Sequence, residues 1–124
     1  MQQETLLAVY GTLKAGEGNN YLLEDAPLLG EHITEPEYTM HQHGFPIVVQ
    51  GGETPITCEI YAVKDPRVVE RVNRLEGFSG TKDHPSNWYD RKTIQTLYGP
   101  AEMFYMKEPQ TGHIIPDGIW KRSK

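Results

Sequence analysis

One segment in the middle of the chain constrains the fold most, because it carries the clearest helix signal among segments patterned as strands. Asp65 is a favourable N-cap residue, and Pro66 suits the first helical position, where its missing N–H costs nothing. Four apolar residues then follow at helical spacing: Val68, Val69, Val72 and Leu75. Gly77 is suited to a C-terminal cap. We therefore predict one main helix over Pro66–Glu76.

The other apolar segments have the composition and length of short β-strands. The expected strands are Leu6–Tyr10, Gly30–Met40, Phe45–Val49, Ile56–Val63, Arg91–Tyr98 and Ala101–Met106. We expect Gly30–Met40 to be one long or irregular edge strand, and the last two strands to form a hairpin around Gly99-Pro100. Strands joined by tight turns, with one main helix packed on them, predict an α+β domain with a mostly antiparallel or mixed, barrel-like sheet.

Length, charge and cysteine content exclude several classes of protein. The 124 residues suffice for a single domain over residues 1–124. The formal charge is −5 and no block of like charge stands out, so we expect no nucleic-acid partner. No apolar stretch is long enough to span a membrane, and the N-terminus does not have the pattern of a signal peptide. Cys58 is the single cysteine, so we expect no intrachain disulfide, which fits a cytoplasmic location. No sequence pattern indicates an oligomeric state.

The run Tyr-Gly-Thr-Leu-Lys at residues 10–14 follows the first apolar strand and predicts a tight turn. Gly11 has no Cβ, so the backbone there is free to adopt unusual dihedral angles and to lie against a ligand. Thr12 is the small hydroxyl residue that completes the turn. Backbone N–H groups in such a turn can hold a carboxylate or an oxyanion.

Glu76 is the anomaly of the helix, because it lies on the same face as Val69 and Val72. A carboxylate on an apolar stripe points toward the core side of the helix. Desolvation there raises its pKa and makes it a better proton acceptor near neutral pH. Alternatively, Glu76 lies in a fraying last turn, and its side chain extends into solvent.

These two features belong to a longer pattern, in which the chain resembles the γ-glutamylcyclotransferase-like family, which includes the AIG2-like proteins. The resemblance covers nearly the whole chain. The matching runs are Tyr10 to Lys14, Phe45-Pro46, Glu59-Ile60-Tyr61, Arg74 to Phe78, Trp88 to Lys92, Ala101 to Tyr105 and Gly118-Ile119-Trp120. The Tyr-Gly-Thr-Leu and Leu-Glu-Gly runs are its specific parts, and the former is closer to the γ-glutamylamine branch of the family.

The resemblance implies a small-molecule γ-glutamyl substrate whose α-amine attacks its own γ-carbonyl. The products are 5-oxoproline and a free amine or amino acid, and neither a metal nor a cofactor is needed. Glu76 would act as general acid and base, and the backbone from Gly11 to Leu13 would hold the substrate carboxylate or the oxyanion. Tyr10 would form a wall of the pocket. Tyr89 would line it near the leaving group, or would instead be an aromatic core residue.

The sequence also departs from the family pattern after the helix. Residues Gly80–Asn87 are polar and indicate an inserted loop, which would alter the leaving group that fits if it covered the cleft. Asp90 occupies a position where relatives often carry a basic residue. Both departures concern the leaving-group side of the site.

Two other functions fit the same pattern. One is a binding module of this fold that recognises a γ-glutamyl-like ligand or a protein without turnover. The other is removal of a γ-glutamyl protecting group from a larger biosynthetic intermediate.

His41 and His43 have metal-compatible spacing, but no third ligand is near them in the sequence, so we expect no metal site. Cys58 lies in an apolar alternation and is expected in the core, because no histidine partner can be assigned to it.

Overall fold

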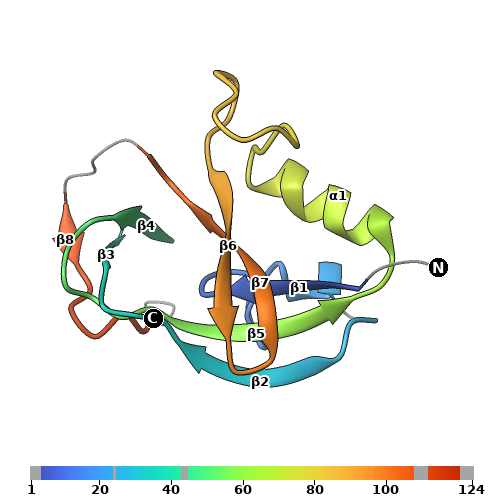
Figure 1. The fold of residues 1–124 in the computed structure, drawn as a ribbon, viewed down its shortest axis with the longest axis horizontal. Helices are drawn as coiled ribbons and strands as arrows, with labels where there is room; N and C mark the ends of the chain where they lie inside the picture. The colour runs from blue at the N-terminus through green and yellow to red at the C-terminus, as the bar shows by residue number, and fades with distance from the viewer. Residues whose placement is uncertain (1–3, 24, 43–44, 108–111, 121–124) are drawn as a thin grey trace.

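A computed structural model of the chain describes residues 4–23, 25–42, 45–107 and 112–120. It contains one α-helix, one short 3₁₀ helix and eight strands within these residues (Figure 1). In chain order they are β1 (Thr5–Val9), η1 (Asn20–Leu23), β2 (Leu28–Ile33), β3 (Tyr38–Gln42), β4 (Pro46–Gln50), β5 (Thr57–Val63), α1 (Pro66–Leu75), β6 (Asp90–Thr96), β7 (Gly99–Tyr105) and β8 (His113–Ile114). The α+β class and the single main helix agree with the sequence prediction.

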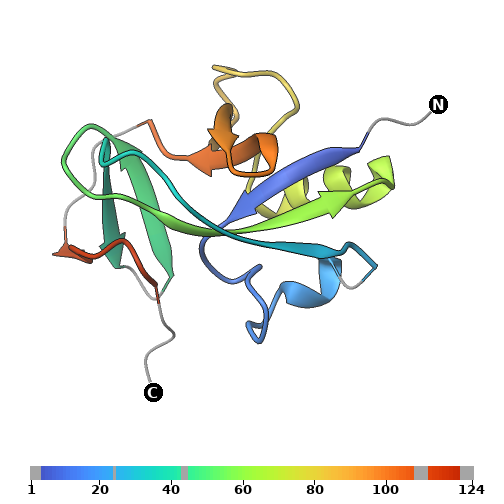
Figure 2. The ribbon, with the colours of Figure 1, turned by 60° about the horizontal axis from the view of Figure 1, so that its bottom comes forward.

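The larger sheet has five strands in the order β2-β5-β1-β7-β6. β1 lies at its centre, antiparallel to β5 and parallel to β7, with Ala8 opposite Ile60 on one side and Met103 on the other. Successive residues of β1 face opposite sides of the sheet. Leu7 and Val9 therefore pack in one core with α1, whereas Ala8 packs in a second core on the opposite face. Figures 1 and 2 show α1 lying along one side of this sheet.

The smaller sheet has three strands in the order β4-β3-β8. It joins the larger sheet where the backbone N–H of Met106 donates to the carbonyl of Val48 at 2.8 Å, just beyond the end of β7. Val49 and Met106 form a parallel bridge at the same place. Within the described residues the strands thus form two joined sheets rather than the closed barrel that the barrel-like prediction implied.

The predicted strand Gly30–Met40 is wrong as a single element, because it divides into β2 and β3 on different sheets. The break lies at Pro36, which has no N–H to donate to a strand ladder. Thr34 closes the end of β2 by accepting a hydrogen bond on its Oγ1 from the N–H of Ile56 at 2.9 Å.

The predicted hairpin of β6 and β7 forms, but its turn lies at Leu97–Tyr98 rather than at Gly99-Pro100. Thr96 fixes this turn, because its Oγ1 donates to the carbonyl of Gly99 at 2.7 Å and accepts from the N–H of Tyr98 at 3.0 Å. Pro100 pairs within β7 instead.

The helix follows the prediction closely. Asp65 caps its first turn, because its side chain accepts a hydrogen bond from the N–H of Arg67 at 2.9 Å. Val72 is fully buried on the face of the helix that packs against the core. Glu76 is the C-cap residue, and Gly77 leaves the helix at φ +67°, a conformation that favours glycine. None of the described helices is both long enough and apolar enough to span a membrane.

Candidate functional site

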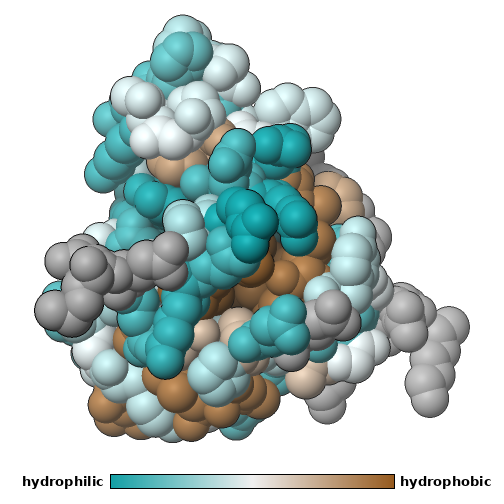
Figure 3. Space-filling model, turned by 90° about the vertical axis from the view of Figure 1, so that its right-hand side faces the viewer, coloured by the Kyte–Doolittle hydropathy of each residue, from teal (hydrophilic) through white to brown (hydrophobic). Residues whose placement is uncertain are grey.

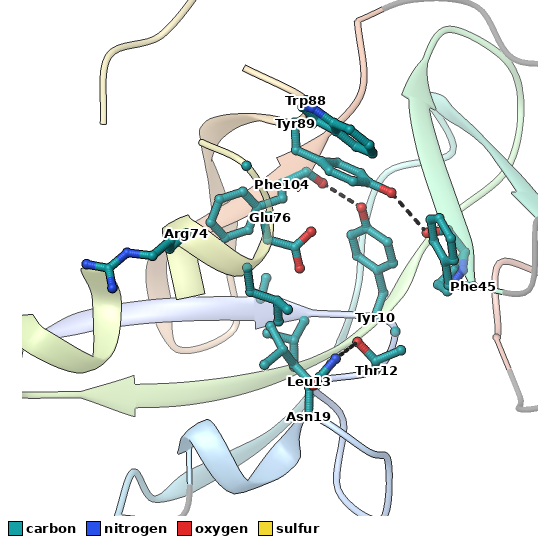
Figure 4. A pocket seen from close by; sticks show the side chains of 16 residues that line it. Tyr10, Thr12, Leu13, Asn19, Phe45, Arg74, Glu76, Trp88, Tyr89 and Phe104 are labelled. Carbon is teal, nitrogen blue, oxygen red and sulfur yellow. Dashed lines mark hydrogen bonds between the residues drawn. The ribbon is translucent and has the colours of Figure 1, made fainter. Parts of the chain in front are cut away.

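A cavity of about 550 Å³ opens where β1, the end of α1, the start of β4 and the segment before β6 meet. Its lining comes from both of the specific sequence runs. The structure brings all the sequence-predicted site residues to this cavity: Tyr10, Gly11, Thr12, Leu13, Glu76 and Tyr89. Figure 4 shows Glu76 near the middle of the site, between Tyr89 on one side and Thr12 with Asn19 on the other.

The turn after β1 is held by its own hydrogen bonds. The N–H of Lys14 donates to the carbonyl of Gly11 at 3.0 Å, and the N–H of Asn19 donates to the carbonyl of Thr12 at 2.9 Å. The Nδ2 of Asn19 also donates to Oγ1 of Thr12 at 2.9 Å. Among the described residues, no acceptor is found for the backbone N–H groups of Gly11, Thr12 and Leu13. The turn therefore has donors to offer a ligand.

Gly11 is needed for a reason different from the predicted one. It does not adopt a positive φ. A Cβ added to Gly11 would lie 2.8 Å from Cγ of Pro46, a separation that real Cβ atoms do not show. Glycine is required here because the turn packs directly against the start of β4.

Glu76 is fixed at the helix end on both sides of its Cα. Its N–H donates to the carbonyl of Val72 at 3.0 Å, and its carbonyl accepts from the N–H of Tyr89 at 3.3 Å. Its side chain points into the cavity near Tyr10 and Phe104 (Figure 4), which argues against the alternative of a fraying last turn. Burial raises the pKa of the Glu76 carboxyl to about 7.

Two tyrosines form a wall beside Glu76. The hydroxyl of Tyr10 donates to the carbonyl of Phe104 at 2.8 Å, and that of Tyr89 donates to the carbonyl of Pro46 at 3.4 Å. Burial, together with the nearby Glu76, raises the pKa of both phenols well above the usual value, so both stay protonated at neutral pH. Tyr89 is both a core residue and a lining residue, so the two sequence interpretations of it are compatible.

Several further lining residues were not singled out as site residues from the sequence. Asn19 comes from a loop whose composition carries no chemical signal. Phe45, Trp88 and Phe104 lie within the family-like runs, so their position in those runs is the signal that could have found them.

The predicted loop Gly80–Asn87 does not line the cavity. It is built around Asp90, whose Oδ1 accepts from Asn87 Nδ2 at 2.7 Å and from the N–H of Asp83 at 3.1 Å. The Nζ of Lys107 lies 3.5 Å from Oδ2 of Asp90. The unusual aspartate at position 90 thus holds the loop and does not face the site.

The residues set aside in the sequence analysis lie elsewhere. Cys58 is fully buried, and burial raises the pKa of its thiol to about 12, so it is not a thiolate at neutral pH. His41 is buried on β3, and His43 lies outside the described residues. No cluster of three or more His, Cys, Asp or Glu side chains suited to a metal ion occurs in the described part of the chain.

Comparison with known proteins adds an independent line of evidence. Residues 7–122 match the family model described as gamma-glutamyl cyclotransferase, AIG2-like. A Vibrio cholerae protein, whose name assigns it provisionally as a gamma-glutamylcyclotransferase, is 35% identical over 117 residues, which cover 93% of this chain and 94% of that protein. The gamma-glutamylcyclotransferase family protein YtfP of Escherichia coli K12 is 31% identical over 114 residues, covering 90% and 92% of the two chains.

Solved structures have the same fold. The crystal structure of the uncharacterized protein PH0828 from Pyrococcus horikoshii superposes with a TM-score of 0.77 at 30% identity, covering 93% of this chain and 88% of that one. An AIG2-like protein from Mus musculus superposes with a TM-score of 0.69 at 21% identity, covering 96% of this chain and 89% of that one. The second likeness concerns the fold alone.

Proposed function

Because this chain belongs to the gamma-glutamyl cyclotransferase, AIG2-like family, we propose that it converts a γ-glutamyl amine or γ-glutamyl amino acid into 5-oxoproline and a free amine. One observation carries the proposal. Glu76, a carboxylate with its pKa raised to about 7, faces the same cavity as the donor-rich turn at Gly11 to Leu13. A proton acceptor and fixed N–H donors are the two parts that this cyclisation requires.

The reaction begins with proton transfer to Glu76. The ionised carboxylate takes a proton from the substrate's α-ammonium group, and the freed amine attacks the γ-carbonyl carbon to close a five-membered ring. A carboxyl with a pKa of about 7 is suited to this step, because near neutral pH it is ionised in a large fraction of molecules and still a competent acid after it gains the proton.

The turn and the wall residues serve the second half of the reaction. The backbone N–H groups of Gly11 to Leu13 hold the substrate carboxylate or the oxyanion of the tetrahedral intermediate. Glu76 then returns its proton to the leaving nitrogen, and the bond between the γ-carbon and that nitrogen breaks. The ring nitrogen gives up its second proton to the departing amine, which leaves as an ammonium ion. Protonated Tyr10 and Tyr89 do not compete with Glu76 as bases, and they close the wall of the cavity.

The decisive experiment compares Glu76→Gln with the wild type and with Glu70→Gln. Glu70 lies on the same helix, but its side chain is exposed and paired with the exposed Arg74. We expect Glu76→Gln to lower the rate of 5-oxoproline release by roughly 10²–10⁴-fold, the usual contribution of a general acid–base group. Glu70→Gln should retain the wild-type rate.

The pH dependence gives a second readout. For the wild type, kcat/KM should rise with pH through about 7 as Glu76 ionises. Wild-type turnover by Glu76→Gln would refute the role of Glu76. A wild-type protein that binds γ-glutamyl compounds in calorimetry but releases no 5-oxoproline would instead identify a binding module.

A further inference from the structure

One rim of the cavity is built from exposed apolar side chains. Trp88 is 76% exposed, and Phe45 and Leu75 are each 44% exposed. All three line the cavity that contains Glu76. In Figure 4, Trp88 lies beside Tyr89, on the side of Glu76 away from Thr12. Large aromatic side chains left exposed at a cavity are typical of a surface that a ligand covers.

The backbone holds Trp88 in place next to the general-base candidate. The N–H of Trp88 donates to the carbonyl of Gly77 at 2.9 Å, directly after Glu76. Gly77 also lies under the indole, because a Cβ added there would be 2.9 Å from Cβ of Trp88 and 3.1 Å from its Cγ. The exposed indole is therefore held in position by a backbone hydrogen bond and by its packing against Gly77.

The charges around the cavity indicate what this rim can accept. Among the described lining residues, the charged ones are Glu76 and Arg74. Arg74 is paired through its Nη2 with Oε1 of Glu70 at 2.9 Å, its side chain is 74% exposed, and Figure 4 shows it pointing away from the cavity. Within the described residues, a leaving group with a carboxylate would thus meet an apolar rim and an acidic side chain, with no cation directed at it.

On the premise of the proposed function, we propose that the preferred leaving group is an apolar amine without a carboxylate, seated on Trp88, Phe45 and Leu75. The polar turn at Gly11 to Leu13 takes the glutamyl end, where donors are needed for a carboxylate and an oxyanion. The apolar rim takes the hydrocarbon of the amine. γ-Glutamyl alkylamides and arylalkylamides are therefore better substrates than γ-glutamyl amino acids of the same side chain.

A matched pair of substrates tests this directly. γ-Glutamyl-phenethylamide and γ-glutamyl-phenylalanine differ by one carboxylate, and γ-glutamyl-isobutylamide and γ-glutamyl-valine form a second such pair. We expect kcat/KM for 5-oxoproline release to be at least about tenfold higher for the amide of each pair. Equal or faster turnover of the amino acid conjugates would overturn the inference and leave the proposed function standing.

Variants of the rim test whether Trp88 and Leu75 set this preference. Trp88→Ala should lower kcat/KM for γ-glutamyl-phenethylamide by about five- to tenfold, and that for γ-glutamyl-methylamide by less than twofold. Trp88→Phe should restore most of the loss.

Leu75→Lys adds a cation to the last turn of α1, where it is compatible with the helix dipole, and should shift the preference toward γ-glutamyl-phenylalanine. Leu97→Ala, which removes an exposed residue of the β6–β7 turn that is not among the lining residues, is the matched control. An equal loss on both amides in Trp88→Ala would contradict the assignment.

Binding to the Glu76→Gln protein separates this inference from the proposed function. Calorimetry should give at least about tenfold tighter binding of γ-glutamyl-phenethylamide than of γ-glutamyl-phenylalanine, whether or not the wild type turns either over. If the wild type releases no 5-oxoproline but this binding preference holds, the proposed function fails and the apolar subsite stands. If the two ligands bind equally, the subsite is refuted.

Discussion

Glu76 and Asp90 are carboxylates at the two ends of one segment, Glu76 half-buried and Asp90 fully buried, and their surroundings differ in a way that separates chemistry from structure. Asp90 is 2% exposed and accepts two hydrogen bonds from the loop that it holds, with Lys107 close by. Glu76 faces the cavity, and within the described residues its carboxylate has no hydrogen-bond or ion-pair partner. A buried acid that the protein surrounds with donors is structural, whereas one left facing a cavity can exchange a proton with a ligand.

The side of the molecule that carries α1 has both hydrophilic and hydrophobic surface. Figure 3 looks onto the side where α1 lies and shows a band of hydrophilic residues beside an exposed hydrophobic patch. The charged residues of α1 itself are exposed: Arg67, Glu70, Arg71 and Arg74. Within α1 and its cap, Glu76 is thus the acidic side chain that the fold directs to the inside.

The largest expected contrast is in activity. Glu76→Gln should reduce kcat by roughly 10²–10⁴-fold, whereas Asp90→Asn should change kcat by no more than a few-fold, because Asp90 does not line the cavity. Steady-state assays of 5-oxoproline release on the two purified variants make this comparison. Equal losses in both would mean that the two acids cannot be separated by function.

The next contrast is in stability. Asp90→Ala leaves the N–H of Asp83 and the amide of Asn87 without their acceptor, and it should lower the free energy of unfolding by about 2–3 kcal/mol. Urea denaturation monitored by tryptophan fluorescence and circular dichroism measures the change. An unchanged midpoint would show that the loop does not depend on Asp90.

Glu76→Gln should raise the free energy of unfolding, whereas Asp90→Ala lowers it, and the gain should depend on pH. The folded pKa of about 7 lies above the unfolded value of 4.5, so the wild type is penalised progressively as pH rises from 4.5 to 7, by at most about 3 kcal/mol. The variant should therefore equal the wild type near pH 4 and be more stable near pH 8. Urea denaturation at both pH values tests this, and a gain at pH 4 of the same size would contradict a titration origin.

The smallest expected effect is at the exposed pair on α1. Glu70→Gln removes a carboxylate whose partner Arg74 is also exposed, so the free energy of unfolding should change by less than about 0.5 kcal/mol. Thermal denaturation at low and high salt measures it. A larger, salt-insensitive change would show that surface exposure does not distinguish Glu70 from Glu76 and Asp90.

Much of this site could be predicted from the amino-acid sequence, because its parts are local. The cap residues Asp65 and Gly77 and the apolar stripe place the helix, and they put Glu76 at its end on the buried face. The run at residues 10–14 predicts the turn. These features depend on neighbours a few residues apart, which is the range over which helix and turn preferences act.

Which surfaces meet could not be predicted in this way, because it depends on packing between distant segments. The parallel pairing of β1 with β7 brings the carbonyl of Phe104 to the hydroxyl of Tyr10. The packing of Pro46 against Gly11 leaves no room for a Cβ at position 11. The division of Gly30–Met40 between two sheets and the role of Asp90 also depend on contacts distant in sequence. Such contacts are fixed by packing and by satisfaction of buried polar groups across the whole fold, and no local pattern encodes them.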